Sequence, residues 1–139
     1  MSVYLDTSFL VAMFVIDANE TAAINFLTGK PDIITSDWAV AEYSSALGLM
    51  VRIGRIAPYD RAAAEADLDR LVANRTPIVA VSSEDIVETR RLLRSARSPL
   101  RTPDALHLAL CRRLGTPIAT FDEGQRRAAI EFGIAVARL

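Results

Sequence analysis

Short apolar runs alternate with longer segments that carry helix signals along the whole chain. The runs hold about four residues each and are bounded by turn or N-cap residues, which is typical of buried strands. The segments between them span about ten to fifteen residues, enough for helices that connect parallel strands. We expect strands at 3–5, 33–35, 78–81 and 117–120, and a last edge strand at 134–137. We expect helices at 9–16, 19–27, 36–52, 58–72, 82–96, 102–114 and 122–132.

This order indicates the α/β fold class: a mostly parallel central sheet of four to five strands with helices on both faces. A chain of 139 residues can bury a core as one domain, and we expect residues 1–139 to form it. In sheets of this kind the ligand crevice lies beyond the carboxyl ends of the strands. Functional residues are therefore expected where the strands end.

The composition is that of an ordinary globular protein. The net charge is −1, with 51% hydrophobic and 24% charged residues, whereas a protein that coats nucleic acid is strongly basic. The longest apolar run, 9–16, is shorter than the ~20 residues that span a bilayer, and the amino terminus lacks the basic segment of a signal peptide. Cys111 is the only cysteine, so no internal disulfide can form. We expect a cytoplasmic protein without membrane contact.

Two aspartates follow expected strands at their carboxyl ends. Asp6 comes directly after the first strand, and Asp122 follows Thr120 at the end of the fourth. If these strands are neighbours, both carboxylates point into one crevice. Alternatively, each only caps the helix that follows it. Ser8 and Thr120 are candidate contacts for the carboxylates or the substrate, and are equally suited to capping, the role we expect for Thr7.

Glu42 is an acid on an otherwise apolar helix, where it is the only charge between Asp37 and Arg52. An unpaired buried carboxylate costs several kcal/mol, and no basic residue lies three or four positions away. A metal ion is therefore the expected partner, with a distant arginine as the alternative. The neighbours that we expect on the same buried face are Trp38, Ala46 and Leu49.

Asp104 lies in the first turn of a helix with buried character. We expect Thr102 as the N-cap, Pro103 at N1 and Asp104 at N2, where the helix dipole alone would favour an acid. His107 and Cys111 lie on the same face, so a zinc site is an alternative. No fourth ligand with suitable spacing is present, and we expect His107 and Cys111 in the core.

Four motifs, taken together, resemble those of PIN-domain nucleases, and most closely those of the VapC-type toxins of bacterial toxin–antitoxin pairs. They are VYLDTS (3–8), AEY (41–43), PDALHLA (103–109) and TFD (120–122), and the resemblance extends from residue 3 to about residue 134. It implies a PIN-like fold and an endoribonuclease that depends on Mg²⁺ or Mn²⁺. The acids that it assigns to catalysis and metal binding are Asp6, Glu42, Asp104 and Asp122. Family members often carry a further acid near the last one, for which Glu123 is a loose candidate, so the number of metal ions stays open.

A site of carboxylate oxygens suits hydrolysis of RNA phosphodiester bonds. Hard cations prefer oxygen ligands, and a bound ion activates a water, polarises the phosphate and stabilises the leaving 3′ oxygen. The resemblance implies a 5′-phosphate product, and no histidine is needed as a base. We expect Arg97 and Arg101, directly before the Asp104 helix, to contact the RNA substrate. As surface arginines they are alternatively solvated.

The resemblance also implies a homodimer and a cognate antitoxin protein as partners. We expect the antitoxin to dock on the first two helices, although core packing is the alternative for each of their large side chains: Phe9, Met13, Phe14, Phe26 and Leu27. Two other functions stay open. One is a non-catalytic PIN-like module that binds RNA or protein, although such a module has no reason to keep four mutually repelling acids. The other is a housekeeping RNA or DNA nuclease.

Overall fold

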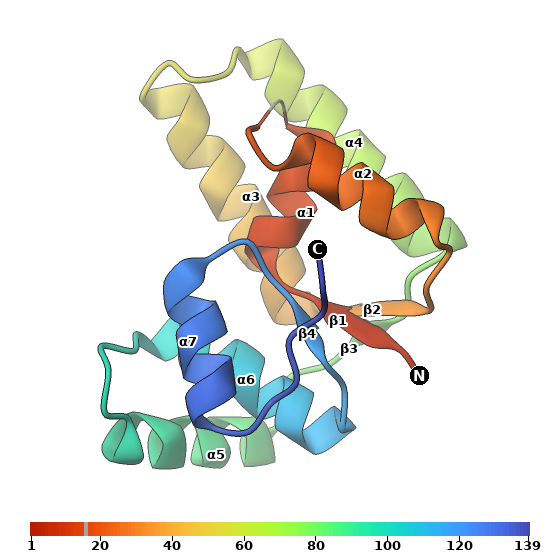
Figure 1. Ribbon diagram of the computed structural model, residues 1–139. Helices are drawn as coiled ribbons and strands as arrows, with labels where there is room; N and C mark the ends of the chain where they lie inside the picture. Colours follow the sequence, from red (N-terminus) through yellow and green to blue (C-terminus); the bar gives the residue numbers. More distant parts are fainter. Residues whose placement is uncertain (16) are drawn as a thin grey trace.

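A parallel sheet lies between two groups of helices in the computed structural model, which describes residues 1–15 and 17–139 (Figure 1). The strands stand in the order β3-β2-β1-β4, and all three neighbouring pairs run parallel. The strands are β1 (Val3–Leu5), β2 (Ile33–Ser36), β3 (Ile78–Val79) and β4 (Ile118–Ala119). The helices are α1 (Thr7–Phe14), α2 (Glu20–Thr28), α3 (Asp37–Arg52), α4 (Pro58–Asn74), α5 (Ser83–Ser95), α6 (Thr102–Leu114) and α7 (Glu123–Glu131).

The side chains of successive strand residues pack into two separate cores, because they point to opposite faces of the sheet. Leu5 packs with buried side chains of α1 to α4, whereas its neighbour Tyr4 packs with those of α5 to α7. In β4, Ala119 and Ile118 divide between the same two cores. Figure 1 shows α1 to α4 above the strands and α5 to α7 below them. The predicted fold class, a parallel sheet covered by helices on both faces, is confirmed.

The sheet is smaller than the apolar runs suggested. Residues 80–81 leave the ladder because the carbonyl of Ala80 accepts from Arg113 and the Val81 amide donates to Asp37. The expected edge strand at 134–137 is reduced to one parallel bridge between Ile118 and Val136. The sheet of the described residues therefore has four strands.

Several helix boundaries differ from the sequence prediction by one or a few residues, and those of α1 and α6 bear on the site. The first helix begins at Thr7, not at residue 9, because Asp6 already caps it, and it ends at Phe14; Ile16, the predicted end, lies outside the described residues. Helix α6 has Arg101 as its N-cap, so the prediction of Thr102 was wrong by one position. Asp104 is therefore at N3.

The large side chains of the first two helices serve the core. Phe9 is fully buried, and its ring stacks on Phe121 and meets Phe26 edge-on. The remaining three, Met13, Phe14 and Leu27, are partly buried and pack against the same core. Each member of this set therefore packs in or against the core, as the alternative expected, and docking of an antitoxin on the outer face of these two helices stays a prediction. None of the helices in the described ranges has the length and apolar character needed to cross a bilayer.

Candidate active site

Four acids from four different parts of the chain line one cleft of about 340 Å³. Asp6 follows β1 and Asp122 follows β4, and these two strands are direct parallel neighbours. Glu42 comes from α3 and Asp104 from the first turn of α6. The structure thus brings together all four acids singled out in the sequence. They lie at the carboxyl end of β1 and β4, where the order of the sheet places a ligand crevice.

Asp6 and Asp122 cap helices as well as line the cleft. Asp6 Oδ1 accepts from the Phe9 amide at 3.0 Å, and Asp122 Oδ1 accepts from the Gln125 amide at 2.7 Å. The two alternatives of the sequence analysis are therefore compatible. Capping holds one oxygen of each carboxylate in place at the mouth of a helix, where the dipole favours negative charge.

Ser8 and Thr120 connect these two aspartates. Ser8 Oγ donates to Asp6 Oδ1 at 2.7 Å and lies 3.2 Å from Thr120 Oγ1, which accepts from the Asp122 amide at 3.0 Å. Ser8 lines the cleft, whereas Thr120 is only 3% exposed and is not part of its lining. Ser8 therefore contacts a carboxylate directly, whereas the Thr120 hydroxyl binds Ser8 and the backbone of Asp122 and helps to lower the pKa of Asp6.

Glu42 has a partner that the sequence analysis missed. Its Oε1 lies 2.5 Å from His107 Nε2 and accepts from Thr7 Oγ1 at 2.9 Å. The prediction that Thr7 caps the first helix was wrong: Thr7 binds Glu42, and the N-cap of α1 is Asp6. His107 is 3% exposed, so the prediction that it is buried was correct.

The position of Glu42 on α3 also differs from the prediction. The buried stripe of this helix is Ala39, Tyr43 and Leu47, one position further along than expected, and Leu49 is 50% exposed. Glu42 stands beside that stripe, with its side chain 25% exposed, at the wall of the cleft.

The charge states of the acids reflect burial and crowding. Burial raises the pKa of Asp6, against the lowering effects of His107 and of hydrogen bonds from Thr120, Ser8 and Phe9. Burial also raises the pKa of Asp104, with Arg101 opposing and the charge of Asp122 adding to the shift. Glu42 behaves differently.

Burial of Glu42 by itself would raise its pKa. The hydrogen bond and charge of His107, together with the Thr7 hydroxyl and the charge of Arg101, outweigh burial and hold that pKa below its usual range. Glu42 is thus ionised more readily than an ordinary glutamate, whereas Asp6 and Asp104 resist ionisation in the absence of a cation.

The two candidate substrate arginines lie in different places. Arg101 lines the cleft, and its Nε lies 3.3 Å from Asp104 Oδ2, with 79% of its side chain exposed. Arg97 is exposed and is not part of the cleft lining, and its backbone amide donates to Glu131 on α7 at 2.7 Å. Only Arg101 is therefore placed to reach a substrate in the cleft.

The cleft also contains an acid that was not predicted. Asp17, in the segment after α1, lines it together with Asn19, whose amide donates to Asp17 Oδ1 at 2.7 Å. In the sequence Asp17 only looks like the start of a turn before the second helix. Glu123, the loose candidate for a fifth acid, is exposed and not part of the lining.

The donor set fits a hard divalent cation, although the side chains are not arranged around one. Among residues 1–15 and 17–139, no group of three or more His, Cys, Asp or Glu side chains has a metal-holding arrangement. Each acid is instead turned to its own partner: Asp6 to Phe9 and Ser8, Glu42 to His107 and Thr7, Asp104 to Arg101, and Asp122 to Gln125. Carboxylate oxygens crowded into one cleft are the ligands that Mg²⁺ and Mn²⁺ prefer. The alternative of zinc is weaker, because Cys111 is buried among apolar side chains that raise the pKa of its thiol.

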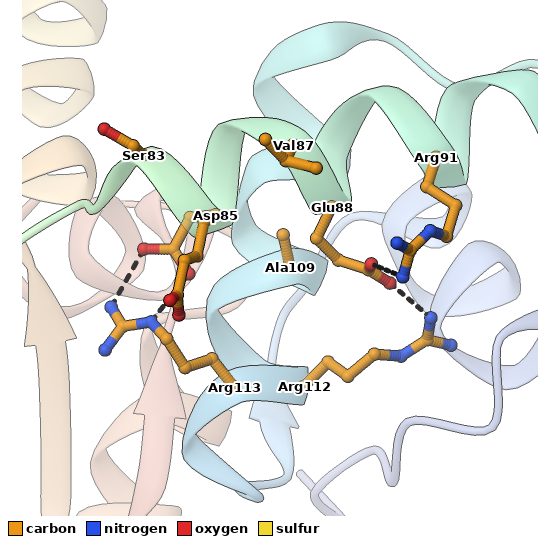
Figure 2. A pocket seen from close by; sticks show the side chains of 9 residues that line it. Ser83, Asp85, Val87, Glu88, Arg91, Ala109, Arg112 and Arg113 are labelled. Carbon is orange, nitrogen blue, oxygen red and sulfur yellow. Dashed lines mark hydrogen bonds and ion pairs between the residues drawn. The ribbon is translucent and has the colours of Figure 1, made fainter.

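A larger cleft of about 510 Å³ lies between α5 and α6, and there two of the three acids, Asp85 and Glu88, are paired with arginines (Figure 2). Arg113 donates to both oxygens of Asp85, at 2.7 and 2.9 Å, and the pKa of Asp85 is lowered because this pairing outweighs its burial. Glu88 accepts from Arg91 and Arg112 at 2.8 and 2.5 Å. In the smaller cleft five acids face one arginine, which makes it the stronger candidate for a cation site.

Comparisons with known proteins identify a family and a set of similar folds. A family model described as PIN domain matches residues 3–131. Among solved structures, VapC20 of Mycobacterium tuberculosis, described as a toxin that cleaves the sarcin-ricin loop, superposes with a TM-score of 0.76 at 23% identity, covering 99% of both chains. FitAcB from Neisseria gonorrhoeae superposes with a TM-score of 0.74 at 19% identity, covering 98% of this chain and 96% of the other. VapBC-5 of Mycobacterium tuberculosis, from the VapBC family of toxin–antitoxin systems, gives 0.64 at 20% identity, covering 99% and 98%. No curated protein matches the chain in sequence.

Proposed function

The chain belongs to the PIN-domain family, and from this premise we propose that residues 1–139 form one nuclease domain, an endoribonuclease that depends on Mg²⁺ or Mn²⁺. One observation carries the proposal: carboxylates from four separate elements line a single cleft. Without a cation, this crowding is unfavourable, since burial and the charge of Asp122 both raise the pKa of Asp104. A bound cation would offset the repulsion, at ~4 kcal/mol for a close pair of charges at an effective dielectric near 20.

The residues divide into three roles under this proposal. Asp6, Glu42, Asp104 and Asp122 would hold the cation, which supplies a Lewis acid for phosphodiester hydrolysis when bound. Ser8 and Thr7 hold Asp6 and Glu42 in place through hydroxyl hydrogen bonds. Arg101, at the rim, is placed to bind a phosphate with its planar guanidinium.

The direct test is to incubate purified protein with labelled tRNA and mRNA in Mg²⁺, Mn²⁺ or EDTA. Cleavage is expected with either cation and should be absent in EDTA. Equal cleavage in the chelator would overturn the metal-dependent mechanism. Cleavage of DNA but not RNA would indicate a DNA nuclease, and RNA binding without any cleavage would indicate a non-catalytic module.

We further propose that the protein acts in the cytoplasm as the toxin of a toxin–antitoxin pair, as a homodimer with a cognate antitoxin. The support is the likeness in fold to structures named as a VapC toxin and as VapBC complexes. The charge of the cleft adds to it. Five acids against one arginine form a surface that a basic segment of a protein inhibitor would fit.

Arg101 gives a further prediction. Arg101→Gln should weaken RNA binding and reduce the slope of log affinity against log salt by about 0.7, the contribution of one phosphate contact with a single strand. Arg97→Gln is the matched control, because Arg97 lies outside the cleft lining, and should leave both quantities unchanged. Binding is measured in EDTA, so that the RNA stays intact. Identical salt slopes for wild type and Arg101→Gln would show that Arg101 is only a solvated surface charge.

A further inference from the structure

A chain of hydrogen bonds runs from β2 to the cleft through two buried aromatic rings. Ser36 Oγ lies 2.7 Å from Tyr4 Oη, which lies 2.7 Å from His107 Nδ1. The other ring nitrogen, Nε2, lies 2.5 Å from Glu42 Oε1. Ser36 and Tyr4 are fully buried and His107, at the wall of the cleft, is 3% exposed, so the chain ends at its most exposed member, Glu42, whose side chain is 25% exposed.

Both ends of this chain are fixed to α3. Ser36 Oγ accepts from the Ala39 amide at 3.0 Å and so caps the helix that carries Glu42. Because an ionised carboxylate only accepts, Nε2 donates to Glu42, and Nδ1 can then accept from the Tyr4 hydroxyl. With both nitrogens engaged and its ring packed 5.7 Å from that of Tyr4, His107 has a single orientation.

The two hydrogen bonds to Glu42 leave one of its oxygens for a ligand. His107 and Thr7 both bind Oε1, and within the described residues no hydrogen bond is made to Oε2. The side chain lines the cleft and is 25% exposed. A carboxylate held through one oxygen in this way can offer the other in a fixed direction.

We propose that His107 is a positioning residue for the metal site: it holds Glu42 through Oε1 so that Oε2 is presented to a divalent cation in the cleft. This inference rests on the proposed function. It assigns His107 neither metal ligation nor a role as a general base, since Nε2 is used in holding Glu42 and Nδ1 is bound to the Tyr4 hydroxyl. Hydrogen-bond partners of metal ligands typically affect metal affinity by about 10- to 100-fold.

A matched pair of substitutions separates this role from simple core packing. The amide nitrogen of His107→Gln can reach the position of Nε2 and donate to Glu42, whereas that of His107→Asn can reach only the position of Nδ1. Both variants place an uncharged amide in the same buried site. If His107 acts by holding Glu42, His107→Gln should keep the metal affinity of the wild type and His107→Asn should lose it.

The experiment measures Mn²⁺ affinity by electron paramagnetic resonance, with circular dichroism to check the fold. His107→Asn should bind Mn²⁺ about 10- to 100-fold more weakly than the wild type, and His107→Gln should stay within about threefold of it. In a Glu42→Gln background the Asn substitution should have no further effect, because its partner is already lost. Tyr4→Phe, which keeps the ring but removes the hydroxyl that holds Nδ1, should weaken binding in the same direction and decides the matter if His107→Asn does not fold.

Three results would overturn the proposal. The first is unchanged Mn²⁺ affinity in folded His107→Asn or, where that variant does not fold, in Tyr4→Phe. The second is an equal loss of Mn²⁺ affinity in His107→Asn and His107→Gln, and the third is a further loss when His107→Asn is added to Glu42→Gln. In each of these the wild type still binds Mn²⁺ and cleaves RNA, so the proposed function stands. A wild type that binds no Mn²⁺ would overturn both.

Discussion

Asp6→Asn is expected to lower the rate of RNA cleavage by ~10³-fold or more while leaving the protein folded. The carboxylate lines the candidate site, and an amide oxygen is a much poorer ligand for a hard cation. The fold should survive because asparagine is as good an N-cap as aspartate and its oxygen can still accept from Phe9 and Ser8. The measurement is single-turnover cleavage of labelled RNA in saturating Mg²⁺ and Mn²⁺.

The same variant should be more stable than the metal-free wild type at neutral pH. Burial raises the pKa of Asp6, so the folded state binds a proton more tightly than the unfolded state does. Below the unfolded pKa of about 3.9 the carboxyl is neutral in both states and the variant gains nothing. As the pH rises from there to the pKa of Asp6 in the folded state, the free energy of unfolding of the wild type falls relative to that of the variant. Above the folded-state pKa the difference between the two proteins stays constant. Thermal melts in EDTA across pH 3 to 8 would measure it.

Asp85→Asn is the matched control: unlike Asp6→Asn, it should lower the stability of the protein and leave its cleavage activity intact. Asp85 is 1% exposed and paired with Arg113 in the other cleft, which holds its pKa below the usual range. Its substitution should destabilise the protein by about 2 kcal/mol at neutral pH, shrinking as the pH falls through about 4, and should leave cleavage intact. Wild-type cleavage by Asp6→Asn, or its loss in a folded Asp85→Asn, would contradict the assignment of the site.

Prediction of the site from the sequence depended on knowing which strands are neighbours in the sheet. Asp6 and Asp122 were expected to meet only if their strands are adjacent, and β1 does pair with β4. The alternating order did not fix that adjacency, but it did place both acids at the carboxyl ends of parallel strands, where a ligand crevice forms. The positions of Asp6, Asp122 and the first turn of α6 could therefore be predicted, and their chemical roles stay predictions.

What could not be predicted are contacts between elements far apart in the chain. Glu42 and His107 are separated by 65 residues, and helical periodicity gives the face of each residue without naming its partner on another helix. The same limit explains why the buried stripe of α3 was misplaced by one position, which put Leu49 inside although it is half exposed. Asp17 was missed because nothing local shows that the segment after α1 returns to the cleft.

Expression of this protein alone in a bacterial host is expected to stop growth. An endoribonuclease with an accessible cleft would degrade cellular RNA unless an inhibitor covers it, and this cleft is open to solvent on the side of Arg101, whose side chain is 79% exposed. Asp6→Asn, produced at the same level, should be harmless because it lacks cleavage activity. Asp85→Asn, if it folds, should arrest growth as the wild type does.

Co-expression with the proposed cognate antitoxin should restore growth. The negative charge of the cleft predicts how the inhibitor binds. A basic side chain of the antitoxin should enter among the acids and form charge-assisted hydrogen bonds in place of the cation. The antitoxin should then lower Mn²⁺ affinity in direct competition, and an inhibitor variant without that basic residue should bind more weakly and fail to restore growth. If the wild-type protein is soluble, binds Mn²⁺ and cleaves RNA in vitro yet does not affect growth, the toxin assignment fails while the nuclease assignment stands, and a housekeeping role becomes the better explanation.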